Sequence, residues 1–120
     1  MRSILVTDAA TNDLLTALKF SLRRFGARAC ERYHALIMQS FDDLAEDATR
    51  PVVIPRNDLH QGIYFYHIKH SRKSVTQKSE RVMQPRHFVA FRLPSGLEIQ
   101  ILRVVYDRSK FERLKYVEDN

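Results

Sequence analysis

A basic and aromatic cluster near the C-terminus holds the side chains best suited to binding an anion. Arg103, Tyr106 and Arg108 lie within six residues, and Lys110 and Phe111 come shortly after them. Arginine and tyrosine can hold a phosphate and stack on a nucleobase, and in a metal-free ribonuclease they stabilise the charge of the transition state. Alternatively, Arg103 pairs with a buried acid or with carbonyl groups, and Arg108 is simply solvated.

The histidines lack the spacing that metal binding needs. Four of the five lie between His60 and His87, but His67 and His70 fall at the end of a predicted strand and point to opposite faces. No cysteine or carboxylate nearby completes a ligand set. None of the three glycines forms a G-x-G pattern, and no serine, threonine or cysteine lies in a nucleophile motif. The sequence therefore predicts neither a metal nor a cofactor.

The positive charge is concentrated in the second half of the chain. Residues 1–60 carry eight basic and eight acidic residues, whereas residues 61–120 carry twelve and six, which accounts for the net charge of +6. A one-sided basic field attracts nucleic acid, anionic lipid or an acidic protein, although a solvated basic loop has the same composition. The charge therefore indicates a polyanionic partner but does not distinguish among nucleic acid, anionic lipid and acidic protein.

Hydropathy and cysteine content predict a cytoplasmic protein without a membrane segment. No apolar run approaches the roughly 18–20 residues of a membrane span, and the first residues lack the apolar stretch of roughly 7–15 found in a secretory signal. The single cysteine, Cys30, cannot form an internal disulfide, which suits a reducing compartment. Its apolar neighbours predict a place in the core.

The first half of the chain has the pattern of a short strand followed by two helices. Residues 4–6 are β-prone, Thr7 and Asp8 are candidate helix caps, and Gly26 is expected to end the first helix. Large apolar residues recur at helical spacing on both sides of Gly26. These stripes are Leu14, Leu15, Leu18, Leu22 and Phe25, then Cys30, Tyr33, Ile37, Phe41 and Leu44. We expect an antiparallel hairpin whose two stripes face the core.

Three antiparallel strands are predicted in the second half. Residues 63–68, 87–93 and 97–106 are rich in aromatic and β-branched side chains, and a turn over 94–96 joins the last two. Apolar residues on both faces place the last strand centrally, with Ile99, Ile101, Arg103 and Val105 on one face. Residues 49–58 are expected as an extended crossing segment, and residues from Lys110 on as a helical turn or a frayed tail.

The order of elements predicts the fold class. A strand, a helical hairpin and a three-stranded antiparallel meander make a small two-layer α+β domain. The 120 residues are too few for two independent cores, so one domain over residues 1–120 is expected. Residues 69–86 are a polar, basic insert without a sustained period.

Four short stretches match, in order, the pattern of one known family. They are residues 10–14, residues 62–64, His87–Arg92, which is similar to the strand H-x-x-x-Y-R, and Ile101–Arg108, which is similar to the strand I-x-R-V-L-H-x-R. From the first helix to Leu114, the chain resembles the RelE/ParE toxins of bacterial type II toxin–antitoxin systems. Its pattern is closest to the ParE branch.

The resemblance implies a cytoplasmic, growth-inhibiting toxin, of a kind associated with plasmid stabilization, held by a cognate antitoxin in a hetero-oligomer. The ParE branch poisons DNA gyrase and is not enzymatic; Arg103, Tyr106, Arg108, Lys110 and Phe111 are then the candidate target-binding residues. The RelE branch is a metal-independent endoribonuclease that cleaves mRNA on the ribosome; Arg103, Tyr106, Arg108 and His87 are then catalytic. A third alternative is a non-toxic relative that binds only an antitoxin.

Two departures from the family pattern bear on these alternatives. Phe91 stands where the family has a tyrosine, which removes a hydroxyl that a ribonuclease could use. The segment 69–86 is longer than the family's connection by more than ten residues. Its role is left open between disorder, antitoxin binding and target binding.

Overall fold

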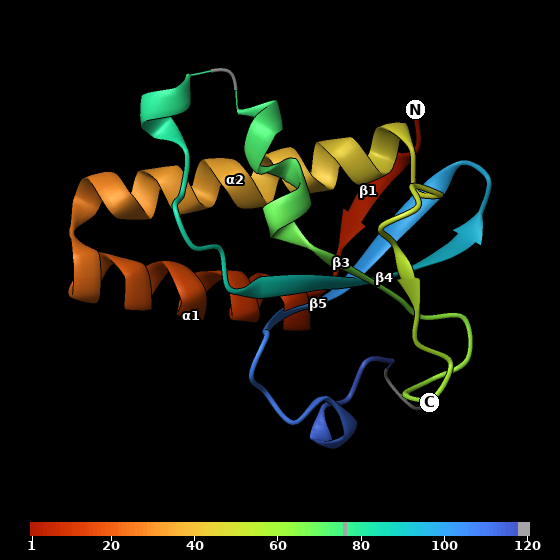
Figure 1. Ribbon diagram of the computed structural model, residues 1–120. Helices are drawn as coiled ribbons and strands as arrows, with labels where there is room; N and C mark the ends of the chain where they lie inside the picture. Colours follow the sequence, from red (N-terminus) through yellow and green to blue (C-terminus); the bar gives the residue numbers. More distant parts are fainter. Residues whose placement is uncertain (76, 118–120) are drawn as a thin grey trace.

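The computed structural model describes residues 1–75 and 77–117, without the side chain of Ser79, and lays a helical hairpin across a five-stranded sheet (Figure 1). The strand order is β1-β5-β4-β3-β2. β1 (Ser3–Val6) runs parallel to β5 (Glu98–Tyr106), whereas β4 (His87–Ser95), β3 (Tyr64–His67) and β2 (Ile54–Pro55) continue antiparallel. The predicted α+β class, and the order of strand, hairpin and three strands, are confirmed.

β2 is an addition to the strands predicted from the sequence. The segment 49–58 was expected only as an extended crossing connection, but Ile54 and Pro55 pair with Phe65 and Tyr64 of β3. Proline has no N–H to donate, so it is tolerated at the edge of a sheet. This explains why the strand is short and lies outermost.

The helical hairpin forms as the capping residues predict. α1 (Asp8–Phe25) begins after Thr7, whose hydroxyl accepts from the Ala10 N–H at 3.2 Å and donates to the Leu102 carbonyl at 3.0 Å. Gly26 follows α1 with a φ of 92°, a conformation that glycine adopts without strain. α2 (Ala27–Glu46) starts immediately after it. The chain therefore reverses direction within one residue.

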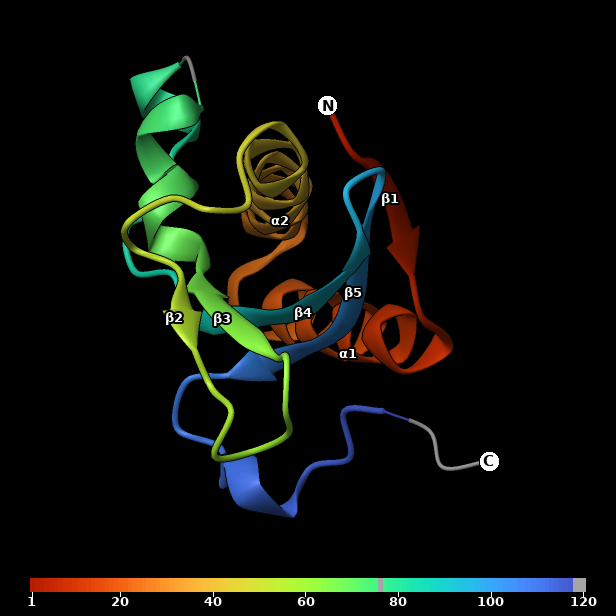
Figure 2. The ribbon, with the colours of Figure 1, turned by 90° about the vertical axis from the view of Figure 1, so that its right-hand side faces the viewer.

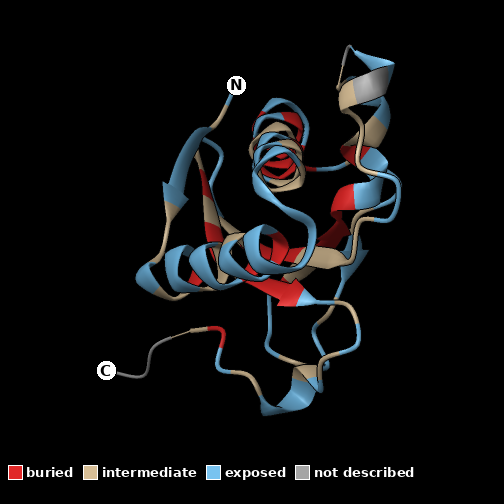
Figure 3. Cartoon of the chain, turned by 90° about the vertical axis from the view of Figure 1, so that its left-hand side faces the viewer, coloured by how far each residue is buried: buried red, intermediate tan, exposed pale blue. Residues whose placement is uncertain are grey.

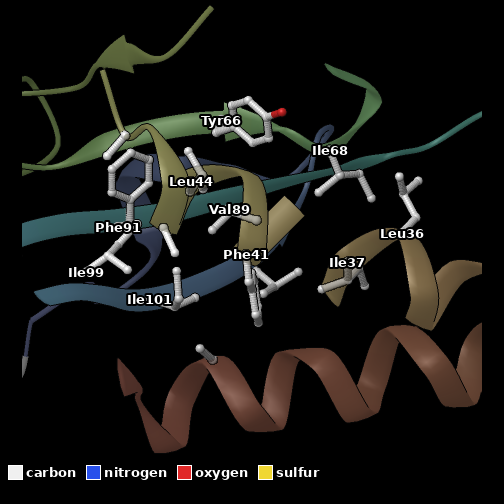
Figure 4. Close-up of a cluster of buried hydrophobic side chains, with 14 residues drawn as sticks. Leu36, Ile37, Phe41, Leu44, Tyr66, Ile68, Val89, Phe91, Ile99 and Ile101 are labelled. Carbon is white, nitrogen blue, oxygen red and sulfur yellow. The ribbon is translucent and has the colours of Figure 1, made fainter. Parts of the chain in front are cut away.

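The apolar stripe of α2 faces the core as predicted, but the stripe of α1 does so only in part, since Leu14 alone of its members packs against the core. In α2, Leu36, Ile37, Phe41 and Leu44 are buried against the sheet (Figure 4). In α1 the buried residues are the small Ala10, Ala17 and Ser21. Leu15 and Leu22 are each 50% exposed and Phe25 is 67% exposed, so the helix after β1 is largely pale blue in Figure 3. Small side chains bring α1 close to its neighbours, and Leu15, Leu22 and Phe25 stay outside.

A bulge in β5 changes which residues face each side of the sheet. Arg103 pairs with Ala90 and Ile101 pairs with Phe91, so β5 has one residue more than β4 at this point. The strict alternation predicted for the strand is therefore wrong beyond Ile101. Val104, rather than Val105, joins Ile99 and Ile101 in the core beneath the helices.

The chain after β5 covers the other face of the sheet and makes a second core. A 3₁₀ turn, η3 (Phe111–Arg113), and Tyr116 pack with residues of β3, β4 and β5 (Figure 2). The Tyr116 hydroxyl donates to the Phe111 carbonyl at 2.8 Å. The predicted helical turn is present, and the described residues up to Val117 pack on the domain. The buried members of this cluster are Ile63, Phe65, Ala90, Leu102, Val105 and Tyr116.

The basic insert is folded along α2. It contains two 3₁₀ helices, η1 (Ile68–Ser74) and η2 (Lys78–Glu80), which lie beside α2 in Figures 1 and 2. Thr76, within the insert, lies outside the described residues. Cys30, expected in the core, is only half-buried, and its thiol lies 3.4 Å from the Leu18 carbonyl as a donor.

Candidate functional site

Arg103 is held by a carboxylate of α1. Its Nε donates to Asp13 Oδ2 at 2.7 Å, its Nη2 donates to Asp13 Oδ1 at 2.9 Å, and its Nη1 donates to the Lys115 carbonyl at 3.0 Å. The bulge turns the Val104 N–H toward the same carboxylate, at 3.0 Å. The hydrogen bonds to Asp13 raise the pKa of Arg103. Of the two roles that the sequence left open for Arg103, this geometry matches the pairing with an acid.

His87 lies against the side chain of Tyr33 from α2. The Tyr33 hydroxyl is 2.6 Å from His87 Nδ1 and accepts from the Arg86 N–H at 2.9 Å. The hydrogen-bonding groups of all three residues are satisfied when the Tyr33 hydroxyl donates a hydrogen bond to His87 Nδ1. Burial lowers the pKa of His87 to about 4 and raises the pKa of Tyr33 to about 12. Both side chains are therefore uncharged at neutral pH. His87 is then not in the imidazolium form that acts as a general acid.

Asp107 joins the two ends of the basic insert. His67 Nε2 lies 3.1 Å from Asp107 Oδ2, and Arg86 Nη2 lies 2.8 Å from Oδ1. Burial opposes the charge on Asp107, but the hydrogen bonds from His67 and Arg86 together lower its pKa. Burial lowers the pKa of His67, whose Nδ1 accepts from the Lys69 N–H at 3.1 Å. His67 is thus a neutral donor to an ionised carboxylate.

Tyr106, Arg108 and Lys110 remain on the open surface beside this network. Tyr106 is 45% exposed, with the guanidinium of Arg86 over its ring at 5.6 Å and His87 edge-on to it at 5.9 Å. Arg108 and Lys110 are exposed, and within the described ranges their side chains make no hydrogen bond or ion pair. These three side chains are free to contact another macromolecule.

Phe111 lies apart from that surface. Its ring is partly buried against the second core, edge-on to Phe65 at 5.3 Å and to Phe88 at 5.8 Å. Its position is that of a packing residue, whereas the sequence put it among the candidate target contacts.

The structure brings only part of the predicted set together. His87, Tyr106 and Arg108 come from neighbouring ends of β4 and β5, whereas Arg103 is fixed to α1. Sequence reasoning did not find Tyr33, His67 and Arg86 as members of this site. Tyr33 and His67 are 54 and 40 residues from their respective partners His87 and Asp107, so no local spacing connects them.

The described residues contain no group of three or more His, Cys, Asp or Glu side chains that could hold a metal ion. A search of the same residues finds no helix with the length and apolar character to span a membrane.

Comparison with known proteins identifies the fold. No family model and no curated protein sequence matches the chain. Among solved structures, it is similar to a chain of the "Chromosomal ParDE TA system from P. aeruginosa", with a TM-score of 0.65 and 20% identity. The similarity covers 88% of this chain and 96% of that chain. The resemblance to the RelE/ParE superfamily, drawn from sequence motifs, is confirmed at the level of the fold.

Proposed function

We propose that this chain is the toxin of a type II toxin–antitoxin system, that it acts in the cytoplasm, and that it inhibits growth by poisoning DNA gyrase. The observation that carries this proposal is the fold shared with a chain of the ParDE system over 88% of the sequence. The fold is compatible with both branches of the superfamily. The choice between them rests on the side chains at the end of the sheet.

The state of Arg103 and His87 favours gyrase over mRNA as the target. A metal-free ribonuclease needs an available cation for the transition-state charge and a group that can exchange a proton near neutral pH. Asp13 occupies the guanidinium of Arg103, and the pKa of His87 is about 4. Poisoning of gyrase requires a binding surface instead, which Tyr106, Arg108 and Lys110 supply.

The exposed side of α1 is suited to a cognate antitoxin. Leu15, Leu22 and Phe25 leave apolar area open on this helix, and a shallow hollow of about 330 Å³ on α1 is lined by Thr16, Lys19, Phe20 and Arg23. Apolar side chains beside lysine and arginine fit a segment that is amphipathic and acidic. We propose that such a segment of the antitoxin folds on α1 and forms a toxin–antitoxin hetero-oligomer.

Inducible expression in a bacterial host tests the target. The proposal predicts growth arrest with filamentation, DNA damage signalling and intact transcripts. Arg108→Ala and Tyr106→Ala should each relieve the arrest. Arg113→Ala, which removes another exposed cation outside the proposed surface, should leave the arrest unchanged.

The second candidate is a ribosome-dependent mRNA endoribonuclease. It is favoured by two groups that lie close to the Tyr106 ring. The His87 ring is 5.9 Å from it, and the Arg86 guanidinium is 5.6 Å from it. It predicts rapid, codon-linked cleavage of mRNA after induction, abolished by Arg108→Ala in a folded protein. Folded protein that arrests nothing indicates the third alternative, a non-toxic relative that binds only an antitoxin.

A further inference from the structure

The insert forms a strap along α2, consisting of the described segments 69–75 and 77–86. Its first segment is anchored to the domain by apolar and polar contacts near η1. Ile68 and Ser71 are buried, and the Ser71 hydroxyl lies 2.7 Å from the Tyr66 hydroxyl. Val75 and Val82 pack against the core between α2 and the sheet. The strap is thus a continuation of the fold and covers part of α2.

Two arginines of the strap hold its segments to each other. Arg72 Nε donates to the Val82 carbonyl at 2.6 Å. Arg81 Nε donates to the Val75 carbonyl at 3.0 Å, and its Nη2 donates to the Lys73 carbonyl at 3.2 Å. These hydrogen bonds join the segment 69–75 to the segment 77–86, so the strap is expected to move as one body.

The tip of the strap is fixed to α2 by Glu80. Its carboxylate accepts from Arg28 and, at 3.3 Å, from Arg32 Nε, and both arginines belong to α2. All three side chains are partly exposed, between 32% and 69%. An ion pair this open to water is weak and sensitive to salt. These ion pairs therefore hold the tip of the strap against α2 only weakly.

The base of the strap is fixed by Asp107. Arg86, at one end of the strap, and His67, just before its other end, both bind this carboxylate. The Tyr33 hydroxyl of α2 accepts from the Arg86 N–H at 2.9 Å. The side chains of His67 and Asp107 are 8% and 18% exposed, against 32% for Glu80, so the base is expected to stay closed when the tip opens.

We propose that the strap is a hinged cover on α2, fastened at its tip by Glu80 and at its base by Asp107, and that it opens when the ion pairs of Glu80 are weakened. This inference does not rest on the proposed function, because every contact in it lies within the chain. Opening at the tip frees Arg28 and Arg32. It also partly uncovers the side of α2 that carries Asp43, whose carboxylate accepts from the Ser74 hydroxyl of the strap at 3.1 Å.

Limited trypsin digestion of the full chain reads the strap directly, since Lys73, Lys78 and Arg81 are trypsin sites within it. Cleavage in the strap is measured by mass spectrometry relative to cleavage after Lys19 in α1 of the same molecule. Glu80→Gln should raise the relative rate by about two- to fivefold at 0.1 M NaCl, the range expected for exposed ion pairs. Glu31→Gln is the matched control, because Glu31 is exposed on α2, the helix of Arg28 and Arg32, and has no ion pair among the described residues.

Salt gives a second readout. Raising NaCl from 0.1 M to 1 M shortens the screening length from about 10 Å to about 3 Å. This should reproduce the faster strap cleavage in the unmodified chain and have little further effect in Glu80→Gln. Equal relative rates in the unmodified chain and Glu80→Gln at low salt would overturn the proposal. Strap amides that exchange with deuterium as fast as those of an unstructured peptide would overturn it as well.

Discussion

Removal of Asp13 should destabilise the fold, because one carboxylate joins α1 to the bulge of β5. Asp13→Ala removes the acceptor of two guanidinium N–H groups and of the Val104 N–H. The side chains of Arg103 and Asp13 are 19% and 17% exposed. Breaking a fully buried ion pair lowers the free energy of unfolding by about 3–5 kcal/mol, so we expect about 2–3 kcal/mol for this less buried pair. For a chain of this length, that lowers the Tm by about 6–15 °C.

Urea denaturation followed by circular dichroism measures this loss. Asn12→Ala, an exposed substitution one residue earlier on α1, serves as the control and should change the free energy of unfolding by less than 0.5 kcal/mol or so. A double-mutant cycle with Arg103→Ala should show a coupling of about 1–3 kcal/mol. If Asp13→Ala falls within the range of the control, or if the two losses simply add, Arg103 is not held by Asp13 and its structural role is refuted.

Three further outcomes are expected. Gly26→Ala should lower the free energy of unfolding by about 1–2 kcal/mol in a thermal or urea melt, since φ is 92° there; an unchanged melt would contradict the reversal at this residue. The folded pKa of His87, about 4, lies below the ordinary value near 6.5, so the stability that this histidine contributes is complete above about pH 6.5 and declines as the pH falls toward 4. The urea midpoint of His87→Gln should therefore depend less on pH over this window than that of the unmodified chain, and an NMR titration of His87 near pH 6.5 would show the idea to be wrong. If an antitoxin segment folds on α1 as proposed, Leu22→Glu should leave the Tm nearly unchanged but weaken its binding at least tenfold by calorimetry; equal affinity would contradict this binding site.

Local signals in the sequence predict the elements and their order. Thr7 and Gly26 set the ends of α1, and Gly96 of the predicted turn follows the end of β4, although Pro94 and Ser95, predicted within the turn, belong to β4 instead. Each of these features depends on a few adjacent residues. The apolar stripe of α2 is also a local signal, and it faces the core.

The parts that sequence reasoning missed depend on contacts between distant residues. Helical spacing identifies an apolar stripe but does not say whether another element covers it, and on α1 the small Ala10 and Ala17 are buried while Leu15, Leu22 and Phe25 are exposed. The bulge at Leu102 shifts the alternation of β5 without a glycine or proline to announce it. Asp13 lies 90 residues from Arg103, so the need for a partner was visible but its identity was not.

A gyrase supercoiling assay with the purified chain tests the central proposal most directly. The chain should inhibit supercoiling of relaxed plasmid and leave cleaved DNA trapped on the enzyme. Arg108→Ala should lose this effect while keeping the Tm of the unmodified chain, and Arg113→Ala should keep the effect. Undiminished supercoiling at a large excess of folded chain, together with codon-linked mRNA cleavage on purified ribosomes, would contradict gyrase as the target and establish the ribonuclease alternative.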